Sequence, residues 1–296
     1  RQVGLGCQGA NNRILIMIDF SAIISTTDRY NFHSHTQYCD GRASMEEMVK
    51  AAIDDGFEHW GFSPHSPVPI ESPCNMSHDS VKSYFDEVTR LKEVYGDRIS
   101  LYASMEIDYL GAEWGPSNPY FDTLPLDYRI GSVHFVPSAD GLVDVDGSEA
   151  TFIKKMDRYF NNDIHYVVNS FYDESIKMVE AGGFDIIGHF DKIGRNAAAF
   201  NPGIESESWY IKRVNDLIDA IIEHGPAVEI NTKAWNDVRR LFPRVEYLPR
   251  LFDAGITVLV NSDAHYPDKV DAGRATGLEV LNKLEETSIN SNILCQ

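Results

Sequence analysis

Short apolar runs alternate with longer helical patterns along most of this 296-residue chain, and this alternation restricts its fold more than any other feature. Each run is four to seven residues long and rich in Ile, Val, Phe or Tyr, as buried strands are. Strands separated by helices run parallel, because each helix returns the chain to the end of the sheet at which the preceding strand began. The runs that we predict to be strands are Tyr30–His33, Glu58–Ser63, Ser100–Glu106, Arg129–His134, Asp185–His189, Ala227–Asn231 and Thr257–Ser262.

Helical patterns fill the intervals between these strands. Ser44 and Glu47 form a capping box ahead of an apolar-periodic stretch. The stretches 81–94 and 210–222 keep helical spacing, and two further helical patterns follow toward the C-terminus. Seven such strand–helix units predict an α/β barrel that is one strand short of the eight-stranded kind. An open doubly wound sheet is the alternative.

The predicted barrel is a single domain over residues 29–296, because no repeat or low-complexity linker divides it. Residues 1–28 are predicted to be an N-terminal extension of unknown role. Within it, Gly4–Gly9 fits G-x-G-x-x-G, but no strand precedes it and no clear helix follows, so we do not predict a dinucleotide site. The segment Arg13–Ile24 resembles the core of a signal peptide, but Asp19 interrupts it, so we do not expect secretion.

The overall charge argues against nucleic acid as a partner. Lys and Arg number 26 and Asp and Glu number 45, which gives a formal net charge of -19. Such a surface repels a phosphate backbone, although a local cationic pocket for one small phosphate is compatible with it. The apolar fraction of 43% is that of an ordinary soluble globular protein.

The cysteines and the apolar runs bear on location. Cys7, Cys39, Cys74 and Cys295 are scattered without a Cys-x-x-Cys pair, so we predict reduced thiols and a cytoplasmic protein. No apolar run approaches the ~20 residues of a membrane span, so we expect no membrane partner. The oligomeric state cannot be predicted from these features.

Histidines and carboxylates cluster at the C-terminal ends of the predicted strands. Six of the ten histidines lie there, and in α/β barrels these ends converge on one rim. Imidazoles and carboxylates together suit Zn, Mn and Fe. Nine ligands exceed what one ion uses, so two or three ions are implied, with Glu106 as a bridge. The candidate ligands are His33, His35, Asp40, His65, Glu106, His134, His189, Asp263 and His265.

The motifs that carry these residues resemble those of the polymerase and histidinol phosphatase (PHP) family of metal phosphoesterases. The similarity covers about Tyr30 to Leu284, and the chain looks most like the stand-alone histidinol-phosphate phosphatases of that family. The motifs, in chain order, are FHSHTQYCDG, SPHSP, MEIDY, GSVHF, GHFDK and NSDAH.

The resemblance implies a distorted seven-stranded barrel with three divalent metal ions (Zn, Mn or Fe) at its rim. It also implies how the ligands divide among the ions. Some family members have histidine where this chain has Asp40, which leaves the metal preference of the third site open. The implied sets are His33, His35, Glu106 and Asp263 for one ion, Glu106, His134 and His189 for a second, and Asp40, His65 and His265 for the third.

The resemblance further implies phosphomonoester hydrolysis, and we expect the small-molecule substrate to be L-histidinol phosphate. A metal ion lowers the pKa of bound water from ~15.7 toward ~7, so neither a Ser nor a Cys nucleophile is needed. We expect Arg195 first, then Lys192, to contact the phosphate, with Arg42 and Lys233 as further cations near the rim. Asp191 is predicted to orient a ligand or the attacking water.

Two alternatives remain open from the sequence. The first is a phosphoesterase that acts on nucleotides or short oligonucleotides. The second is a non-catalytic metal-binding regulatory module, which the full set of nine ligands disfavours.

Overall fold

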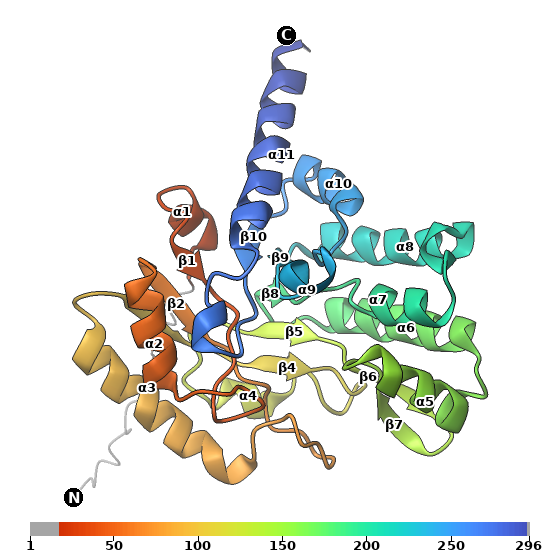
Figure 1. Ribbon diagram of the computed structural model, residues 1–296, viewed down its shortest axis with the longest axis horizontal. Coiled ribbons are helices and arrows are strands. Elements are labelled where there is room, and N and C mark those ends of the chain that lie inside the picture. The colour runs from red at the N-terminus through yellow and green to blue at the C-terminus, as the bar shows by residue number, and fades with distance from the viewer. Residues whose placement is uncertain (1–17, 295–296) are drawn as a thin grey trace, which may run out of the picture.

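The computed structural model describes residues 18–294 and shows parallel strands flanked by helices (Figure 1). Three strands form one parallel sheet in the order β1 (Tyr30–Asn31), β2 (His59–Phe62) and β3 (Ser100–Ala103). A second parallel sheet has five strands, in the order β10 (Val258–Asn261), β9 (Ala227–Asn231), β8 (Ile186–Ile187), β5 (Ile130–Ser132) and β4 (Glu106–Asp108). The predicted α/β class with parallel strands is therefore confirmed.

The predicted seven-stranded barrel is not confirmed, because the strand ladders of residues 18–294 do not close. The expected strand Ser100–Glu106 is broken: β3 pairs with β2, whereas β4 pairs with β5. The buried Tyr84 hydroxyl lies 2.7 Å from the Ser104 carbonyl and 3.0 Å from that of Phe62. The Ser104 amide still donates to the Phe62 carbonyl at 2.8 Å. Pro64 has no amide hydrogen to offer the Ser104 carbonyl, so the Tyr84 hydroxyl takes that place, and Glu106 begins β4 instead of ending β3.

The predicted helices are present. Helix α2 (Met45–Asp54) begins with the expected capping box, in which Ser44 accepts from the Glu47 amide and the Glu47 carboxylate accepts from the Ser44 amide. The other predicted helices are α3 (Val81–Tyr95), α8 (Ser208–His224), α10 (Leu248–Asp253) and α11 (Arg274–Leu294).

Elements that the sequence reading did not assign lie mostly between β5 and β9. An antiparallel hairpin follows β5 directly, and three helices precede or follow β8. Most of these elements contribute residues to one wall of the cavity described below. They are β6 (Phe135–Ser138), β7 (Gly141–Asp144), α5 (Glu149–Phe160), α6 (Ile164–Ala181) and α7 (Ile193–Phe200), with the short helices α4 (Pro119–Asp122) and α9 (Trp235–Val238) elsewhere.

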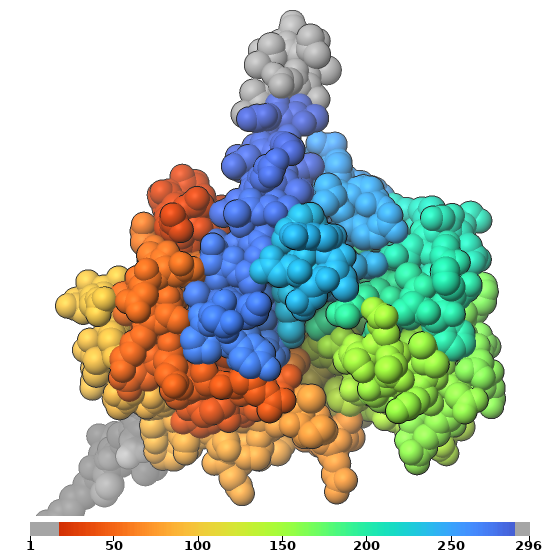
Figure 2. Space-filling model, in the orientation of Figure 1, coloured from red at the N-terminus to blue at the C-terminus, as the bar shows by residue number. Residues whose placement is uncertain are grey.

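The core is divided by the two sheets. One apolar cluster packs α2 and α3 against β2 and β3, and another packs α5 to α8 beside the five-stranded sheet. A third cluster, with Tyr30, Phe32, Tyr128, Ile130 and Leu259, lies between the strands themselves. Figure 2 shows the N-terminal elements and the green helices on opposite sides, with the blue C-terminal segments between them.

Part of the predicted N-terminal extension packs on this core. In α1 (Phe20–Ile24), the Phe20 ring lies 4.9 Å from that of Phe32 and 5.5 Å from that of Tyr128. The segment Gly4–Gly9 lies outside the described residues, and the proposed domain division stays a prediction. Among the described helices, none combines the length and apolar character needed to cross a membrane.

Candidate metal centre

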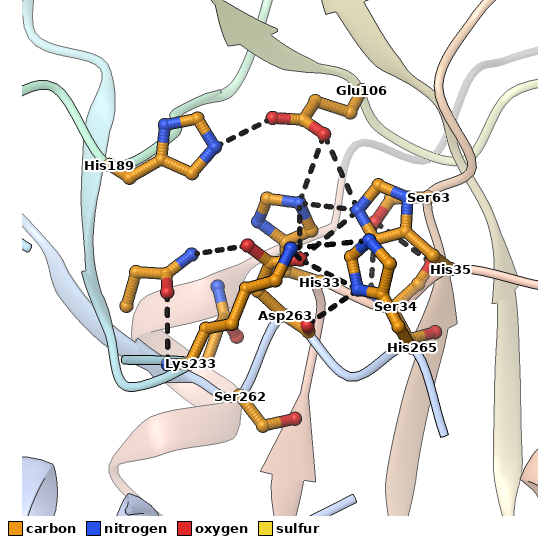
Figure 3. A network of polar contacts seen from close by, with 12 residues as sticks. His33, Ser34, His35, Ser63, Glu106, His189, Lys233, Ser262, Asp263 and His265 are labelled. Atoms are coloured by element: carbon orange, nitrogen blue, oxygen red, sulfur yellow. Dashed lines mark hydrogen bonds and ion pairs between the residues drawn. The ribbon is translucent and has the colours of Figure 1, made fainter. Parts of the chain in front are cut away.

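Glu106 contacts buried histidines through both oxygens of its carboxylate, with His189 on one side and His33 and His35 on the other (Figure 3). Its Oε1 is 2.9 Å from His189 Nε2 and 3.5 Å from His134 Nε2. Its Oε2 faces the other side, at 3.1 Å from His65 Nδ1, 3.3 Å from His33 Nε2 and 3.4 Å from His35 Nε2. A carboxylate whose two oxygens face separate imidazole groups has the geometry of a bridging ligand, as the sequence predicted.

Asp263 completes one of these groups. His35 Nε2 lies 3.2 Å from Asp263 Oδ1 and 3.2 Å from His33 Nε2, so the three side chains can hold one ion. Asp263 follows β10 with a φ of 48°, in the left-handed region that Asp tolerates better than most residues. Such strain at a cluster of ligands is typical of a functional site.

A second group lies where the first loop meets the end of β10. Asp40 Oδ1 is 3.3 Å from His265 Nε2, 3.5 Å from His35 Nδ1 and 3.8 Å from His65 Nε2. The four side chains lie close enough to share an ion. This is the predicted third set with His35 added. Gly41 permits the loop to turn here, because a Cβ on it would lie 2.2 Å from the Thr36 nitrogen.

His134 Nε2 lies 3.5 Å from Glu106 Oε1, beside His189, as the expected second set requires. Its Nδ1 lies 2.6 Å from Asp108 Oδ1, and it forms a potential metal group with Asp108 and His65. His189 instead groups with Glu106 and His33. Every one of the nine predicted ligands thus lies in at least one such group, and Asp108 is an additional member that the sequence reading missed.

The charges of the cluster are those of metal ligands. Burial alone would raise the pKa of Glu106, but the surrounding histidines, His65 first, lower it well below its usual value, so Glu106 is ionised. Burial lowers the pKa of His35 to about 4, which leaves a neutral imidazole with a free lone pair. Burial opposes protonation of His134 too, but Asp108 and Glu106 raise its pKa to about 9. Metal binding there displaces a proton, so the affinity rises with pH.

The hydrogen-bond inventory of the cluster also fits divalent cations. Buried polar atoms rarely lack a partner in folded proteins. Fifteen buried side-chain atoms of the described residues do so, and six of them belong to predicted ligands of this cluster: Asp40 Oδ1, His65 Nδ1, Glu106 Oε1, Glu106 Oε2, His134 Nε2 and His189 Nε2. Lone pairs aimed at a common space are what a metal ion requires.

A cavity of about 790 Å³ opens onto this cluster and is lined by Asp40, His65, His134 and His265. Three of the predicted phosphate-binding cations, Lys192, Arg195 and Lys233, line it as well. The Lys192 ammonium pairs with Asp146 at 2.8 Å, and Arg195 approaches Glu149 at 3.4 Å. Lys233 lies nearest the ligands, with its Nζ 3.2 Å from His265 Nε2 and 3.4 Å from Asp263 Oδ1.

Asp191 and Arg42 are not among the residues that line the cavity. Asp191 is fully buried, accepts a hydrogen bond from the Arg244 amide at 2.9 Å and lies 3.8 Å from the Arg240 guanidinium. Burial raises its pKa to about 7 against the lowering effect of Arg240. These contacts indicate that Asp191 holds the segment after His189, and they give no support to contact with a substrate.

Glu229, which lies within the predicted strand Ala227–Asn231, is a further residue that the sequence analysis did not single out. Glu229 is fully buried in β9 and accepts from His33 Nδ1 at 2.9 Å and from the His189 amide at 2.9 Å. For Asp108, the other residue that was missed, the sequence did contain a signal. Glu106 and Asp108 lie two positions apart in a short buried strand, so their side chains point to the same face of the sheet.

Comparison with known proteins agrees with this geometry. The curated protein of Schizosaccharomyces pombe named "Probable histidinol-phosphatase" is 27% identical over 275 residues, which covers 87% of this chain and 87% of that protein. The hisK structure from Listeria monocytogenes has a TM-score of 0.74 and 17% identity, covering 83% of this chain and 99% of that one.

The structure of histidinol phosphate phosphatase from Lactococcus lactis, complexed with zinc, L-histidinol and phosphate, has a TM-score of 0.67 and 19% identity. It covers 87% of this chain and 94% of that one. The family model described as the PHP domain matches residues 31–233, a segment that contains the whole cluster except its last two ligands. This chain therefore belongs to the PHP domain family.

Proposed function

We propose that this protein hydrolyses L-histidinol phosphate to L-histidinol and phosphate with the aid of divalent metal ions. The observation that carries the proposal is the convergence of nine buried or half-buried ligands around Glu106 at one side of an open cavity. The relatives named as histidinol phosphatases, and the zinc, histidinol and phosphate bound to one of them, support the choice of reaction.

We propose three ions, held as the resemblance implied. His33, His35, Glu106 and Asp263 would hold the first, and Glu106, His134 and His189 the second. Asp40, His65 and His265 would hold the third, with His35 close enough to contribute. Zn, Mn and Fe all suit these ligands. When bound, such ions neutralise phosphoryl oxygens and lower the pKa of water.

The protein's own cations complete the phosphate site. Lys192 and Arg195 line the cavity from the start of α7, and Lys233 lines it from the loop after β9; each is partly exposed. Burial would lower the pKa of Lys192, but Asp146 first, then Asp263 and Glu106, raise it above its usual value, so it stays cationic. A fixed ammonium beside the ligands can bind a phosphoryl oxygen and oppose the charge that develops during transfer.

Replacing Lys192 by Met is expected to lower kcat/KM by about 10- to 100-fold, because a hydrogen bond to a charged group contributes about 1.5–3 kcal/mol. Metal content should not change. Steady-state kinetics on histidinol phosphate and elemental analysis test both statements. Lys212→Met is the matched control, since Lys212 pairs with Asp216 on the exposed face of α8. A K192M enzyme with the wild-type kcat/KM would remove Lys192 from the phosphate site.

The outer part of the cavity favours a cationic substrate over a nucleotide. Glu71, Asp140 and Asp237 line it and are exposed there. Carboxylates attract the ammonium and imidazole of histidinol and repel additional phosphates. Turnover of histidinol phosphate should therefore exceed that of AMP, a nucleoside bisphosphate and a short single strand in a parallel assay. Faster hydrolysis of any of these nucleotides would overturn the substrate assignment, and no hydrolysis even of p-nitrophenyl phosphate would favour the regulatory alternative.

We also propose that the two sheets form one interrupted barrel, which is the finer form of the predicted fold. Two isolated parallel bridges, Ser34–Ala264 and His65–Glu106, join the sheets at both edges, and both lie beside the ligand cluster. The cytoplasmic location stays a prediction that the free thiols of Cys39 and Cys74 support.

A further inference from the structure

Strand β9 supplies none of the nine predicted ligands, yet it carries a fully buried carboxylate directly beneath them. Glu229 has no exposed surface, and its neighbours Val228 and Ile230 on the strand are apolar. Burying a carboxylate costs several kcal/mol unless its lone pairs are satisfied. An apolar side chain at this position would avoid that cost, which indicates that the carboxylate has a role other than packing.

Four donors satisfy Glu229. His33 Nδ1 lies 2.9 Å from Oε2 and 3.1 Å from Oε1, and the His189 amide donates to Oε1 at 2.9 Å. Asn231 Nδ2 donates to Oε1 at 2.9 Å, and Asn261 Nδ2 donates to Oε2 at 3.0 Å. Every lone-pair direction of the carboxylate is thus used, and no metal ion is needed to explain its burial.

These contacts reach three of the ligand-bearing segments at once. The first is the segment after β1, through the His33 ring, and the second is the segment after β8, through the His189 amide. The third is the segment after β10, because Asn231 Nδ2 also lies 3.1 Å from Asp263 Oδ2. Glu229 therefore connects parts of the cluster that come from separate strands.

The contact with His33 fixes which ring nitrogen carries the hydrogen. An ionised carboxylate only accepts hydrogen bonds, so a His33 ring that binds an ion, and is therefore neutral, must place its hydrogen on Nδ1. The lone pair then lies on Nε2, which faces Glu106 at 3.3 Å and His35 Nε2 at 3.2 Å. Metal-binding histidines commonly have their other nitrogen held in this way, and loss of the partner typically lowers metal affinity 10–100-fold.

We propose that Glu229 is a positioning residue for the metal centre, which holds His33 in its metal-binding tautomer and fixes the segments of His189 and Asp263 around it. The inference rests on the proposed metal-dependent function. It concerns the affinity for the ion and can be tested without a substrate.

The test is the zinc affinity of the 296-residue chain, measured by chelator competition. Glu229→Gln keeps the shape of the side chain, but it places an NH₂ donor where all the neighbouring groups also donate. A donor that faces His33 Nδ1 favours the tautomer with the hydrogen on Nε2, which leaves no lone pair on Nε2 for an ion. We expect zinc to bind E229Q about 10- to 100-fold more weakly than wild type. Glu174→Gln is the control, because this carboxylate is largely buried on α6 but remote from the cluster, and its zinc affinity should match wild type.

A second variant separates positioning from simple structural support. In E229Q/N261D, the carboxylate introduced at position 261 offers an acceptor to the amide group introduced at position 229. The oxygen of that amide can then turn back to accept from His33, His189 and Asn231. The double variant should recover zinc affinity to within about threefold of wild type. A purely structural role would lower the melting temperature of E229Q and leave the zinc affinity of the folded protein unchanged.

Either of two results would overturn the proposal. One is a folded E229Q that binds zinc as wild type does, and the other is a folded double variant that shows no recovery. If E229Q does not fold, the double variant alone decides. Lack of activity on histidinol phosphate in the wild-type protein would refute the proposed substrate and leave the affinity result standing.

Discussion

Replacing Glu106 by Gln is expected to lower kcat/KM on histidinol phosphate by about 10³-fold or more, because removal of one group that stabilises transition-state charge already costs about 10²–10³. Here the same carboxylate also approaches five histidines within 3.5 Å. An amide offers only one acceptor oxygen and carries no charge, so one side of the cluster loses its oxygen ligand and the other side keeps only a neutral one. The Gln amide group would face imidazole nitrogens that need to keep their lone pairs for the ions.

The E106Q protein should therefore contain less metal as well as being inactive. Elemental analysis of the purified variant, beside steady-state rates at saturating zinc, tests the two effects separately. Glu279→Gln is the control, since it makes the same change on an exposed ion pair with Lys283 on α11. Normal metal content in E106Q would show that Glu106 is not a shared ligand, and activity within about threefold of wild type would remove it from the reaction.

Much of this cluster could be predicted from the sequence because the topology is simple. Parallel strands place their C-terminal ends on one side, so histidines that follow several strands must converge. That argument placed His33, His65, His189 and Asp263 in one cluster without any coordinates, and the structure brings them together. The local signal at Ser44 also predicted the start of α2 correctly, since a capping box depends on adjacent residues alone.

Other features depend on contacts between distant segments and could not be predicted in this way. The break between β3 and β4 arises where Pro64 has no amide hydrogen for the Ser104 carbonyl, which accepts from the hydroxyl of Tyr84 on α3 instead. The hairpin β6–β7, which follows β5 directly, was not among the predicted strands. Asp191 was predicted from its place beside His189, but its side chain turns toward Arg244 and away from the cavity.

Removing the metal ions is expected to abolish hydrolysis and also to destabilise the fold. An ion present at 100 times its Kd adds about 2.7 kcal/mol to the stability of the folded state. For a chain longer than 150 residues, each kcal/mol changes Tm by roughly 2–4 °C, so one ion should account for a shift of roughly 5–10 °C. The reason is local: without the ions, both oxygens of Glu106 and the Nε2 atoms of His134 and His189 are buried without hydrogen bonds.

The measurement is a pair of thermal melts, before and after chelator treatment, with metal content followed by elemental analysis and activity by phosphate release. Zinc added back should restore both activity and Tm. The E106Q variant provides the internal control, because a protein that already lacks its bridging ligand should lose less stability to the chelator than wild type does. If wild type retains its Tm after the metal is gone, the buried cluster is stable by itself and the ions serve the reaction alone. If activity persists as well, the nine ligands that the fold assembles do not act through metal ions, and the proposed chemistry is wrong.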